Sequence, residues 1–387
     1  MSALPLQWQY GSSHNVAKLG RLDIPGGGQV VVQDGYAYIG HMAPPLGTSV
    51  VDVRDPRNPR LVAQIPAPPA GMSHKARVRR DGILVTNSQK LRRAPDNPDF
   101  KPGIRIFDAS NPEQPRQITQ WHCAGVGVHR FDIDDRYAYL AAELEGFRGR
   151  IVVILDLKDP EKPEEVGRWW LPGQWIAGGE QPTWEARRHS CHHPLRYGER
   201  LYVSYWHAGF MILDIADMTK PKLVTHLDWS PPYPCPTHTA LRIPWKLKDH
   251  DFLLCTDEEV GDRLTRWPAA FVWMVDITDE TKPLPVSTFK GPDNPEAPAD
   301  EGFGAHQPQE QLYPGDNIIA VTWFSGGLRL IDISDPYALR EVGHYTPHPA
   351  AGQPQLASND VFVAPDKRIY LIDRFNGLEI LEYTGER

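Results

Sequence analysis

The chain has 387 residues, with 41 Lys and Arg against 49 Asp and Glu, so its formal net charge is −8. Nucleic-acid binders draw most of their affinity from neutralised phosphates, so an acidic chain without a basic cluster predicts no nucleic-acid partner. There is no apolar run of the length that a membrane span requires, and the start MSALPLQWQY lacks the pattern of an export signal. Four cysteines without CxxC spacing fit a reducing compartment, so we expect a cytoplasmic protein without a membrane partner.

An apolar run that ends in an acidic residue recurs roughly every 55 residues along the chain. In chain order the runs read GTSVVDVRDPRNP, GIRIFDASNPEQP, GRIVVILDLKDPEKP, GFMILDIADMTKP, FVWMVDITDETKP, GLRLIDISDPYAL and GLEILEYTG. Most are followed at fixed distances by Asp or Asn and then by Pro. Asp and Asn cap the backbone of a turn and Pro presets its dihedral angle, so each run predicts a strand followed by the same turn.

Three further strand-like segments accompany nearly every run, two before it and one after its turn. Four short antiparallel strands per unit are typical of a propeller blade. The last unit stops after its third strand, whereas VAKLGRLDIP near the N-terminus matches the fourth-strand pattern. We therefore predict an all-β fold, a seven-bladed β-propeller over residues 1–387 as one domain. An N-terminal strand would complete the last blade and remove the open edge.

The runs resemble the repeats of the LVIVD-repeat family of β-propellers, and this resemblance covers nearly all of the chain. It implies the fold but no particular activity, because propellers carry unrelated functions.

Long insertions fall in the connections that would open on one face of such a propeller. They cover residues 88–102, 171–192, 257–269, 290–305 and 346–359. Because loops on a rigid scaffold carry most sites, we predict that this is the working face. The insertions 171–192 and 290–305 are expected to form a lid over the site, and the alternative is that they pack as ordinary surface loops or form a contact in a homo-oligomer.

Histidine recurs at the predicted start of the innermost strand in five of the seven units. These residues are His74, His129, His193, His238 and His306, and the other two units have Gly28 and Asp360 there. Several neutral imidazoles in one place are typical of a transition-metal site, because each donates a nitrogen without adding charge. Copper or iron is favoured, with zinc and manganese as alternatives. If the register is shifted by one residue, the ligand is His192 and not His193.

Other polar and aromatic residues are expected on the same face. The candidate catalytic residues are Glu143, Glu258 and His207, with the two carboxylates acting as a base, orienting imidazoles or completing the metal coordination. The candidate substrate-binding residues are His41, Trp206, Asp257, Trp323, Arg374 and Asp360. A structural role is the alternative for each of them.

The stretch YWHAGFMILDIAD is similar to part of the selenium-binding protein family, which includes copper-dependent methanethiol oxidases. Carotenoid-cleaving oxygenases also hold an iron with four histidines on a seven-bladed propeller. Both analogies imply a metal-dependent oxidoreductase or oxygenase that acts on a small organic molecule. A metal-dependent hydrolase or lyase stays open, and so does a scaffold that binds a protein partner and no metal.

Overall fold

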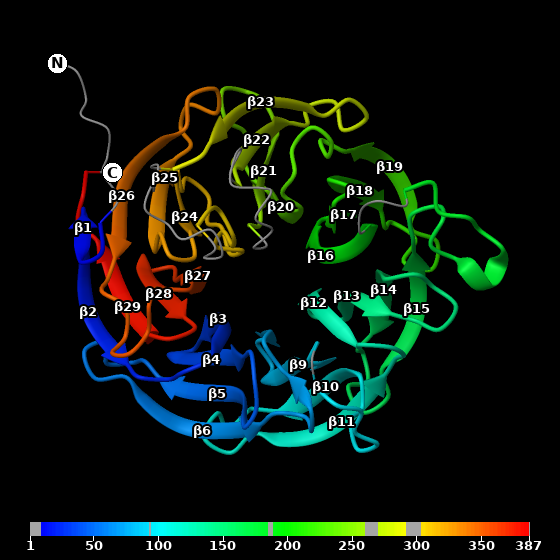
Figure 1. The fold of residues 1–387 in the computed structure, drawn as a ribbon, viewed down its shortest axis with the longest axis horizontal. Helices are drawn as coiled ribbons and strands as arrows, with labels where there is room; N and C mark the ends of the chain where they lie inside the picture. The colour runs from blue at the N-terminus through cyan, green and yellow to red at the C-terminus, as the bar shows by residue number, and fades with distance from the viewer. Residues whose placement is uncertain (1–8, 93, 185–188, 260–269, 292–302, 387) are drawn as a thin grey trace. The chain divides into compact units, whose positions relative to one another are not determined.

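The computed structural model describes residues 9–92, 94–184, 189–259, 270–291 and 303–386 (Figure 1). The chain divides into two compact units, which are described separately. The four-sheet unit is Gly26–Trp229, and the three-sheet unit consists of Met1–Pro25 and Ser230–Arg387. Among the described residues the only helix is the single turn η1 (Ile176–Gly178), and no helix there has the length and apolar character to cross a membrane.

The described part of the four-sheet unit contains four antiparallel sheets, each formed by strands that follow one another in the sequence. The first contains β3 (Gly27–Gln33), β4 (Tyr36–His41), β5 (Leu46–Asp52) and β6 (Arg60–Pro66). The second contains β7 (Gly71–Met72), β8 (Ala76–Val78), β9 (Ile83–Lys90), β10 (Gly103–Asp108) and β11 (Arg116–His122). The third contains β12 (Val128–Ile133), β13 (Tyr137–Glu143), β14 (Arg150–Asp156) and β15 (Glu164–Trp169). The fourth contains β16 (His189–Tyr197), β17 (Arg200–Trp206), β18 (Phe210–Asp214) and β19 (Lys222–Leu227).

The described part of the three-sheet unit contains three antiparallel sheets. The first contains β20 (Thr237–Arg242), β21 (Phe252–Asp257), β22 (Val272–Asp276) and β23 (Leu284–Phe289). The second contains β24 (Ile318–Thr322), β25 (Leu328–Asp332), β26 (Arg340–Thr346) and β1 (Ser12–His14). The third contains β27 (Ser358–Val363), β28 (Arg368–Asp373), β29 (Gly377–Tyr383) and β2 (Val16–Leu22). The fold class is therefore a seven-bladed β-propeller, as the repeat predicts.

The N-terminal strand completes the last blade, which confirms the predicted closure. Strand β2 pairs antiparallel with β29, with Val16 opposite Tyr383 and Leu22 opposite Leu378. Figure 1 shows the two strands side by side, β2 in blue and β29 in red. The structure also contains a strand that the sequence did not predict. This strand, β1, has three residues and pairs with β26.

An acidic residue, which we call the anchor, ends each apolar run of the repeat. The predicted turn after each anchor forms through acidic side chains. The Asp55 carboxylate accepts the backbone N–H of Arg57 at 3.0 Å, and the Asp217 carboxylate accepts that of Thr219 at 3.0 Å. The apolar core fills the space between neighbouring sheets, where Ile106 of β10, Phe131 of β12 and Val153 of β14 pack in one cluster. The repeated turn and the apolar runs thus place the start of every innermost strand at an equivalent position.

The insertions are described only in part. Residues 260–269 and 292–302 lie outside the described residues, and the predicted lid over 290–305 falls largely among them. The insertion 171–192 contains η1 and the start of β16, and 346–359 connects β26 to β27. The prediction of one domain over residues 1–387 stays a prediction.

Candidate functional site

A β-bulge at the start of the innermost strands sets the register of the candidate site. In β20 the pairing skips one residue between Thr237 and Thr239, and in β27 it skips one between Ser358 and Asp360. Strands β3, β12 and β16 are broken at corresponding places. A bulge adds a residue to one strand and re-aims side chains, so counting back from the second strand alone misplaces the residues beyond it.

The bulge corrects the predicted register in two blades. Equivalent pairs lie at the fourth residue of each second strand, and they include Phe131 with Leu140, Pro194 with Val203 and Ala240 with Cys255. Two residues before such a pair lies what we call the ring position. In the seven blades it is occupied by Gly28, His74, His129, His192, His238, His306 and Asn359. His193 and Asp360 were therefore misplaced by one residue and lie one step further along their strands.

The ring-position histidines of the four-sheet unit contact one another. The ring centroids of His74 and His129 are 4.8 Å apart, and those of His129 and His192 are 4.7 Å apart. The Nε2 atoms of His129 and His192 are 3.0 Å apart, which is hydrogen-bond distance. The three imidazoles thus form a continuous row, in which His74 and His192 are buried and His129 is partly buried.

Hydrogen bonds define the tautomers in this row. The side-chain amide of Asn87 accepts the Lys75 backbone N–H through Oδ1 at 2.9 Å and donates through Nδ2 to His74 Nδ1 at 3.0 Å. Neutral His74 therefore carries its proton on Nε2 and presents a donor there. His129 donates from Nδ1 to Gln89 Oε1 at 2.7 Å, so its Nε2 accepts from His192. The row is internally hydrogen-bonded.

Burial lowers the pKa of His129 well below its usual value, and the positive charge of Arg150 lowers it further. Burial also lowers the pKa of His193, with Lys75 as the next cause. The Lys75 ammonium lies 3.1 Å from His193 Nε2 and donates to it. Both imidazoles are thus neutral at pH 7, and the His193 lone pair is already used as an acceptor.

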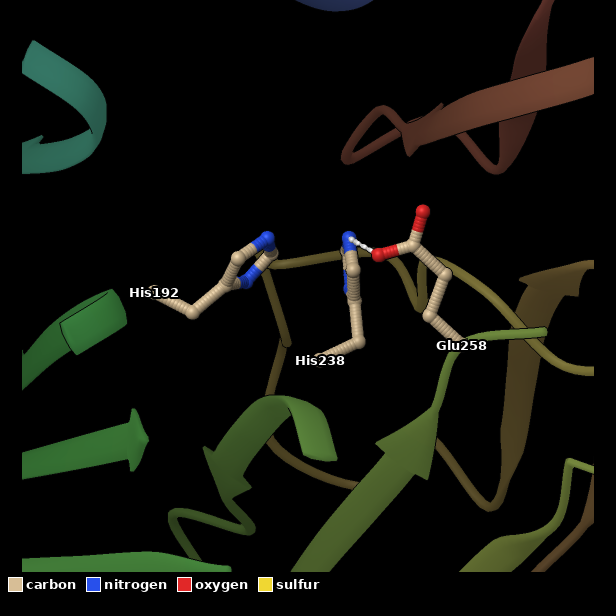
Figure 2. A group of neighbouring side chains, drawn as sticks. All are labelled: His192, His238 and Glu258. Carbon is tan, nitrogen blue, oxygen red and sulfur yellow. Dashed lines mark ion pairs between the residues drawn. The ribbon is translucent and has the colours of Figure 1, made fainter. Parts of the chain in front are cut away.

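The ring-position histidines of the three-sheet unit face a carboxylate. His238 Nε2 lies 3.9 Å from one Glu258 carboxylate oxygen, and His306 Nε2 lies 3.9 Å from the other. The two imidazole centroids are 4.2 Å apart. Figure 2 shows the His238 ring edge turned to the Glu258 carboxylate; its third labelled residue, His192, belongs to the four-sheet unit. These distances exceed those of a hydrogen bond.

The Nδ1 atoms of this pair are donors. His306 Nδ1 lies 2.7 Å from the backbone carbonyl oxygen of Asn359, which can only accept. His238 Nδ1 lies 2.8 Å from Thr239 Oγ1, whose proton points to Gln307 Oε1. In the neutral imidazoles both Nε2 atoms therefore carry lone pairs, and these lone pairs are directed to the negatively charged Glu258.

Two imidazole lone pairs beside a carboxylate form a donor set suited to a metal ion. Ligand atoms at about 2.1 Å from one ion lie about 3.0 to 3.4 Å from one another, so each imidazole nitrogen, now 3.9 Å from a carboxylate oxygen, would have to move closer to Glu258 to bind the same ion. His238, with no exposed side-chain surface, and His306, at 2 %, are fixed by their Nδ1 hydrogen bonds. His238, His306 and Glu258 could thus hold a cation.

The predicted residues of the four-sheet unit have mainly structural contacts. His41 is buried, and its Nε2 lies 2.7 Å from Ser49 Oγ. Glu143 accepts the backbone N–H of Val126 at 3.0 Å and braces the loop before β12. Trp206 stacks on His192 with a centroid distance of 4.7 Å, and His207 lies edge-on to Trp206 at 6.1 Å. None of these contacts tests the predicted roles in catalysis or substrate binding.

In the three-sheet unit, Asp257 and Trp323 have structural contacts as well. Asp257 is buried and accepts the Trp273 indole N–H at 2.7 Å. Trp323 is fully buried and packs edge-on against Phe289 at 5.7 Å. Arg374 is connected to the histidine pair through Asn359 and Phe324.

Sequence reasoning missed Asn359 and Phe324. Asn359 has the ring position of its blade, and its carbonyl orients His306. Phe324 stacks on the His306 ring with a centroid distance of 4.2 Å. Asn359 could not be placed from the sequence because the bulge shifts the register there. Phe324 follows the end of a strand and has a positive φ of 44°, a conformation that the sequence does not indicate.

The LVIVD repeat family matches residues 27–65, 197–228 and 319–347. No curated protein matches the chain, so the similarity to selenium-binding proteins stays a prediction.

Solved structures with a similar fold share little sequence with the chain. Saccharomyces cerevisiae Sqt1 is 10% identical with a TM-score of 0.59, and the match covers 97% of this chain and 100% of Sqt1. A chain of the mitotic checkpoint complex is 10% identical with a TM-score of 0.59 and 99% and 95% coverage. The computationally designed protein Ika8 is 7% identical with a TM-score of 0.52 and 95% and 99% coverage. At this identity the likeness shows the fold alone. Together with the matched repeats and the seven sheets, it identifies the chain as a β-propeller that contains LVIVD repeats.

Proposed function

We propose that this protein is a metal-dependent enzyme whose ion is bound by His238, His306 and Glu258. The observation that carries the proposal is the pair of Nε2 lone pairs directed at one carboxylate from 3.9 Å. Without a cation, neutral imidazoles gain little from this arrangement, because a lone pair and a carboxylate repel each other. A bound cation turns the same geometry into three favourable contacts.

The donor set favours an oxidoreductase. Two histidines and one carboxylate that leave coordination positions open are typical of non-haem Fe(II) oxygenases. Iron is therefore our first candidate and copper the second, and the substrate is a small organic molecule. The same three ligand types also bind zinc in hydrolases, where the ion lowers the pKa of a bound water. Hydrolase or lyase chemistry with zinc or manganese is the alternative.

The role of Glu258 becomes more specific in this proposal. The sequence leaves three roles open for Glu258, as a general base, as a group that orients imidazoles or as a ligand that completes the coordination, and its position opposite both Nε2 atoms supports the role as ligand. The sequence also predicts that the ring-position histidines of the four-sheet unit bind the same ion. That prediction stays open, and the direct test is the metal content of variants in each unit.

The test is elemental analysis of protein expressed without a His tag. We expect about one equivalent of iron or copper in the wild type, and loss of at least nine-tenths of it in the double variant His238→Ala and His306→Ala. The matched control is His344→Ala, which removes an imidazole that contacts Glu341 on β26 and leaves the pair intact. Full metal content in the double variant would refute the proposed site.

A protein scaffold without metal is the alternative from another class. One chain with a similar fold belongs to the mitotic checkpoint complex, but that likeness shows the fold alone. A wild type that takes up no iron, copper, zinc or manganese when reconstituted would favour the scaffold. In that case size-exclusion chromatography would next test for a homo-oligomer.

We also propose a cytoplasmic location. All four cysteines are free thiols, which fits a reducing compartment. Fractionation of the expressing cells, with the protein found in a cytoplasmic fraction, is the expected outcome.

A further inference from the structure

We propose that Arg374 binds an anionic group of the substrate next to the candidate metal site, so that the substrate is a small organic anion such as a carboxylate. This inference rests on the proposed function, because it defines the substrate class of the same site. It is carried by the geometry of Arg374, Asn359 and Phe324.

Arg374 is held in place by its backbone and by one side of its guanidinium group. Its backbone N–H donates to the Ala357 carbonyl at 3.0 Å, and Nε donates to Asn359 Oδ1 at 2.9 Å. The guanidinium carbon lies 5.5 Å from the centroid of the Phe324 ring. Within the described ranges, the two terminal nitrogens have no hydrogen bond and no ion pair. Their N–H groups are available to a ligand.

Asn359 connects this guanidinium to the histidine pair. Its side-chain oxygen accepts from Arg374, and its backbone oxygen accepts from His306 Nδ1 at 2.7 Å. Phe324 makes the second connection, because His306 stacks on its ring and Arg374 lies over it. One residue and one ring therefore fix the guanidinium relative to a predicted metal ligand.

The charges near Arg374 favour an anion. Burial lowers the pKa of Arg374, and the negative charges of Glu258 and Asp373 oppose this shift. Asp373 already accepts backbone N–H groups from Ala357, Phe375 and Asn376. A cation bound to Glu258 would remove most of the remaining compensation. An anion on Arg374 would then restore the balance, since a partly buried charge without a counter-charge is unfavourable.

The guanidinium group suits a carboxylate better than a point charge would. It presents parallel N–H donors that match the two oxygens of a carboxylate, and such charge-assisted pairs are stronger than neutral hydrogen bonds. A neutral amide of the same shape offers one acceptor and a competing donor group. We therefore expect the site to distinguish a carboxylate from its amide.

The test uses trifluoroacetate as the probe and trifluoroacetamide as its neutral counterpart, with binding followed by fluorine NMR. Both metal-depleted and iron-reconstituted full-length protein are titrated. We expect the wild type to bind trifluoroacetate in preference to the amide, and more tightly with iron present. Arg374→Gln should weaken trifluoroacetate binding by about tenfold or more, with iron content unchanged. The control Arg340→Gln makes the same charge change at an exposed ion pair with Asp332 and should bind as the wild type does.

A second variant keeps the inference testable if Arg374→Gln fails to fold. Asn359→Asp keeps an acceptor for Arg374 and keeps the backbone carbonyl for His306, but it supplies a competing negative charge. It should also weaken trifluoroacetate binding by about tenfold. Equal binding by wild type and Arg374→Gln, or no preference over the amide, would overturn the inference. Binding that depends on Arg374 in a wild type that takes up no metal would refute the proposed function alone.

Discussion

The ring position is occupied by histidine in both units, yet the imidazoles differ in what they offer. In the four-sheet unit, His74 accepts from Asn87 and His129 accepts from His192, so the lone pairs of these two imidazoles are used within the protein. In the three-sheet unit, His238 and His306 donate from Nδ1 and turn Nε2 toward Glu258. The partner of Nδ1 therefore decides the chemistry of a repeated histidine, and its place in the repeat does not.

The surrounding charges follow the same division. The pKa of His129 is lowered by burial and then by Arg150, so cations surround the four-sheet row. The His238 and His306 rings instead have a carboxylate within 3.9 Å. A cation is thus disfavoured beside the first cluster and favoured beside the second.

The largest expected effect comes from a comparison of two substitutions that each remove the charge of one carboxylate, Glu258 in the three-sheet unit and Glu143 in the four-sheet unit. Glu258→Gln keeps the side-chain shape but removes the charge between His238 and His306, and we expect metal affinity to fall by about 100-fold or more. Glu143→Gln makes the same change in the four-sheet unit, where the carboxylate braces the Val126 N–H. That variant should keep its metal. Metal titrations monitored by competition with a chelator measure both, and equal losses would remove the distinction between the units.

The second comparison uses adjacent histidines of the four-sheet unit. His192 has the ring position, so His192→Ala should lower metal affinity by about tenfold if this unit shares the ion. His193→Ala should leave metal affinity unchanged, because His193 Nε2 accepts from Lys75. It should instead lower the free energy of unfolding by about 1–3 kcal/mol, since the buried ammonium loses its acceptor.

Metal titration and urea unfolding separate the two outcomes. Loss of metal from His193→Ala and not from His192→Ala would restore the register first predicted from the sequence. No loss from either variant would confine the ligands to the three-sheet unit.

The sequence predicted the fold well, because the fold depends on local patterns that repeat. The turn after each anchor, the apolar runs and the missing last strand are all visible in the residues, and the pairing of β2 with β29 followed from them. The site was predicted less accurately. The bulge adds one residue without any composition signal, so His193 was chosen over His192 and Asp360 over Asn359.

Long-range hydrogen bonds also could not be predicted from the sequence. The Asn359 carbonyl that orients His306 is 53 residues away in the chain, and such a contact exists only after the blades form. Candidate residues at strand ends were chosen by position alone. Asp257 and His41 have that position; one Asp257 oxygen accepts from the indole of Trp273, His41 Nε2 lies 2.7 Å from the hydroxyl of Ser49, and their predicted roles stay predictions.

The smallest expected effect concerns a feature that should be the same in both units. This feature is the acidic residue that ends each apolar run of the repeat. The pKa of the Asp52 carboxyl is lowered chiefly by its hydrogen bonds from Arg54, with Arg60 adding to the effect. Burial would raise the pKa of Asp332, but hydrogen bonds from Ser334 and Arg340 lower it below its usual value.

A carboxyl whose pKa is lowered on folding adds stability above its unfolded pKa of about 4, and this stability is lost as the pH falls. Because the arginines are largely exposed, we expect only about 1 kcal/mol from each carboxylate at pH 7. Asp52→Asn and Asp332→Asn should therefore lower the free energy of unfolding in urea by that amount at pH 7, and by progressively less as the pH falls below about 4. The loss should be greater for Asp52, which has two arginine partners, and it should persist to lower pH there because the pKa of the folded carboxyl is lowered furthest. A loss that does not decrease as the pH falls, in one unit only, would mean that these acids, like the histidines, depend on their neighbours and not on the repeat.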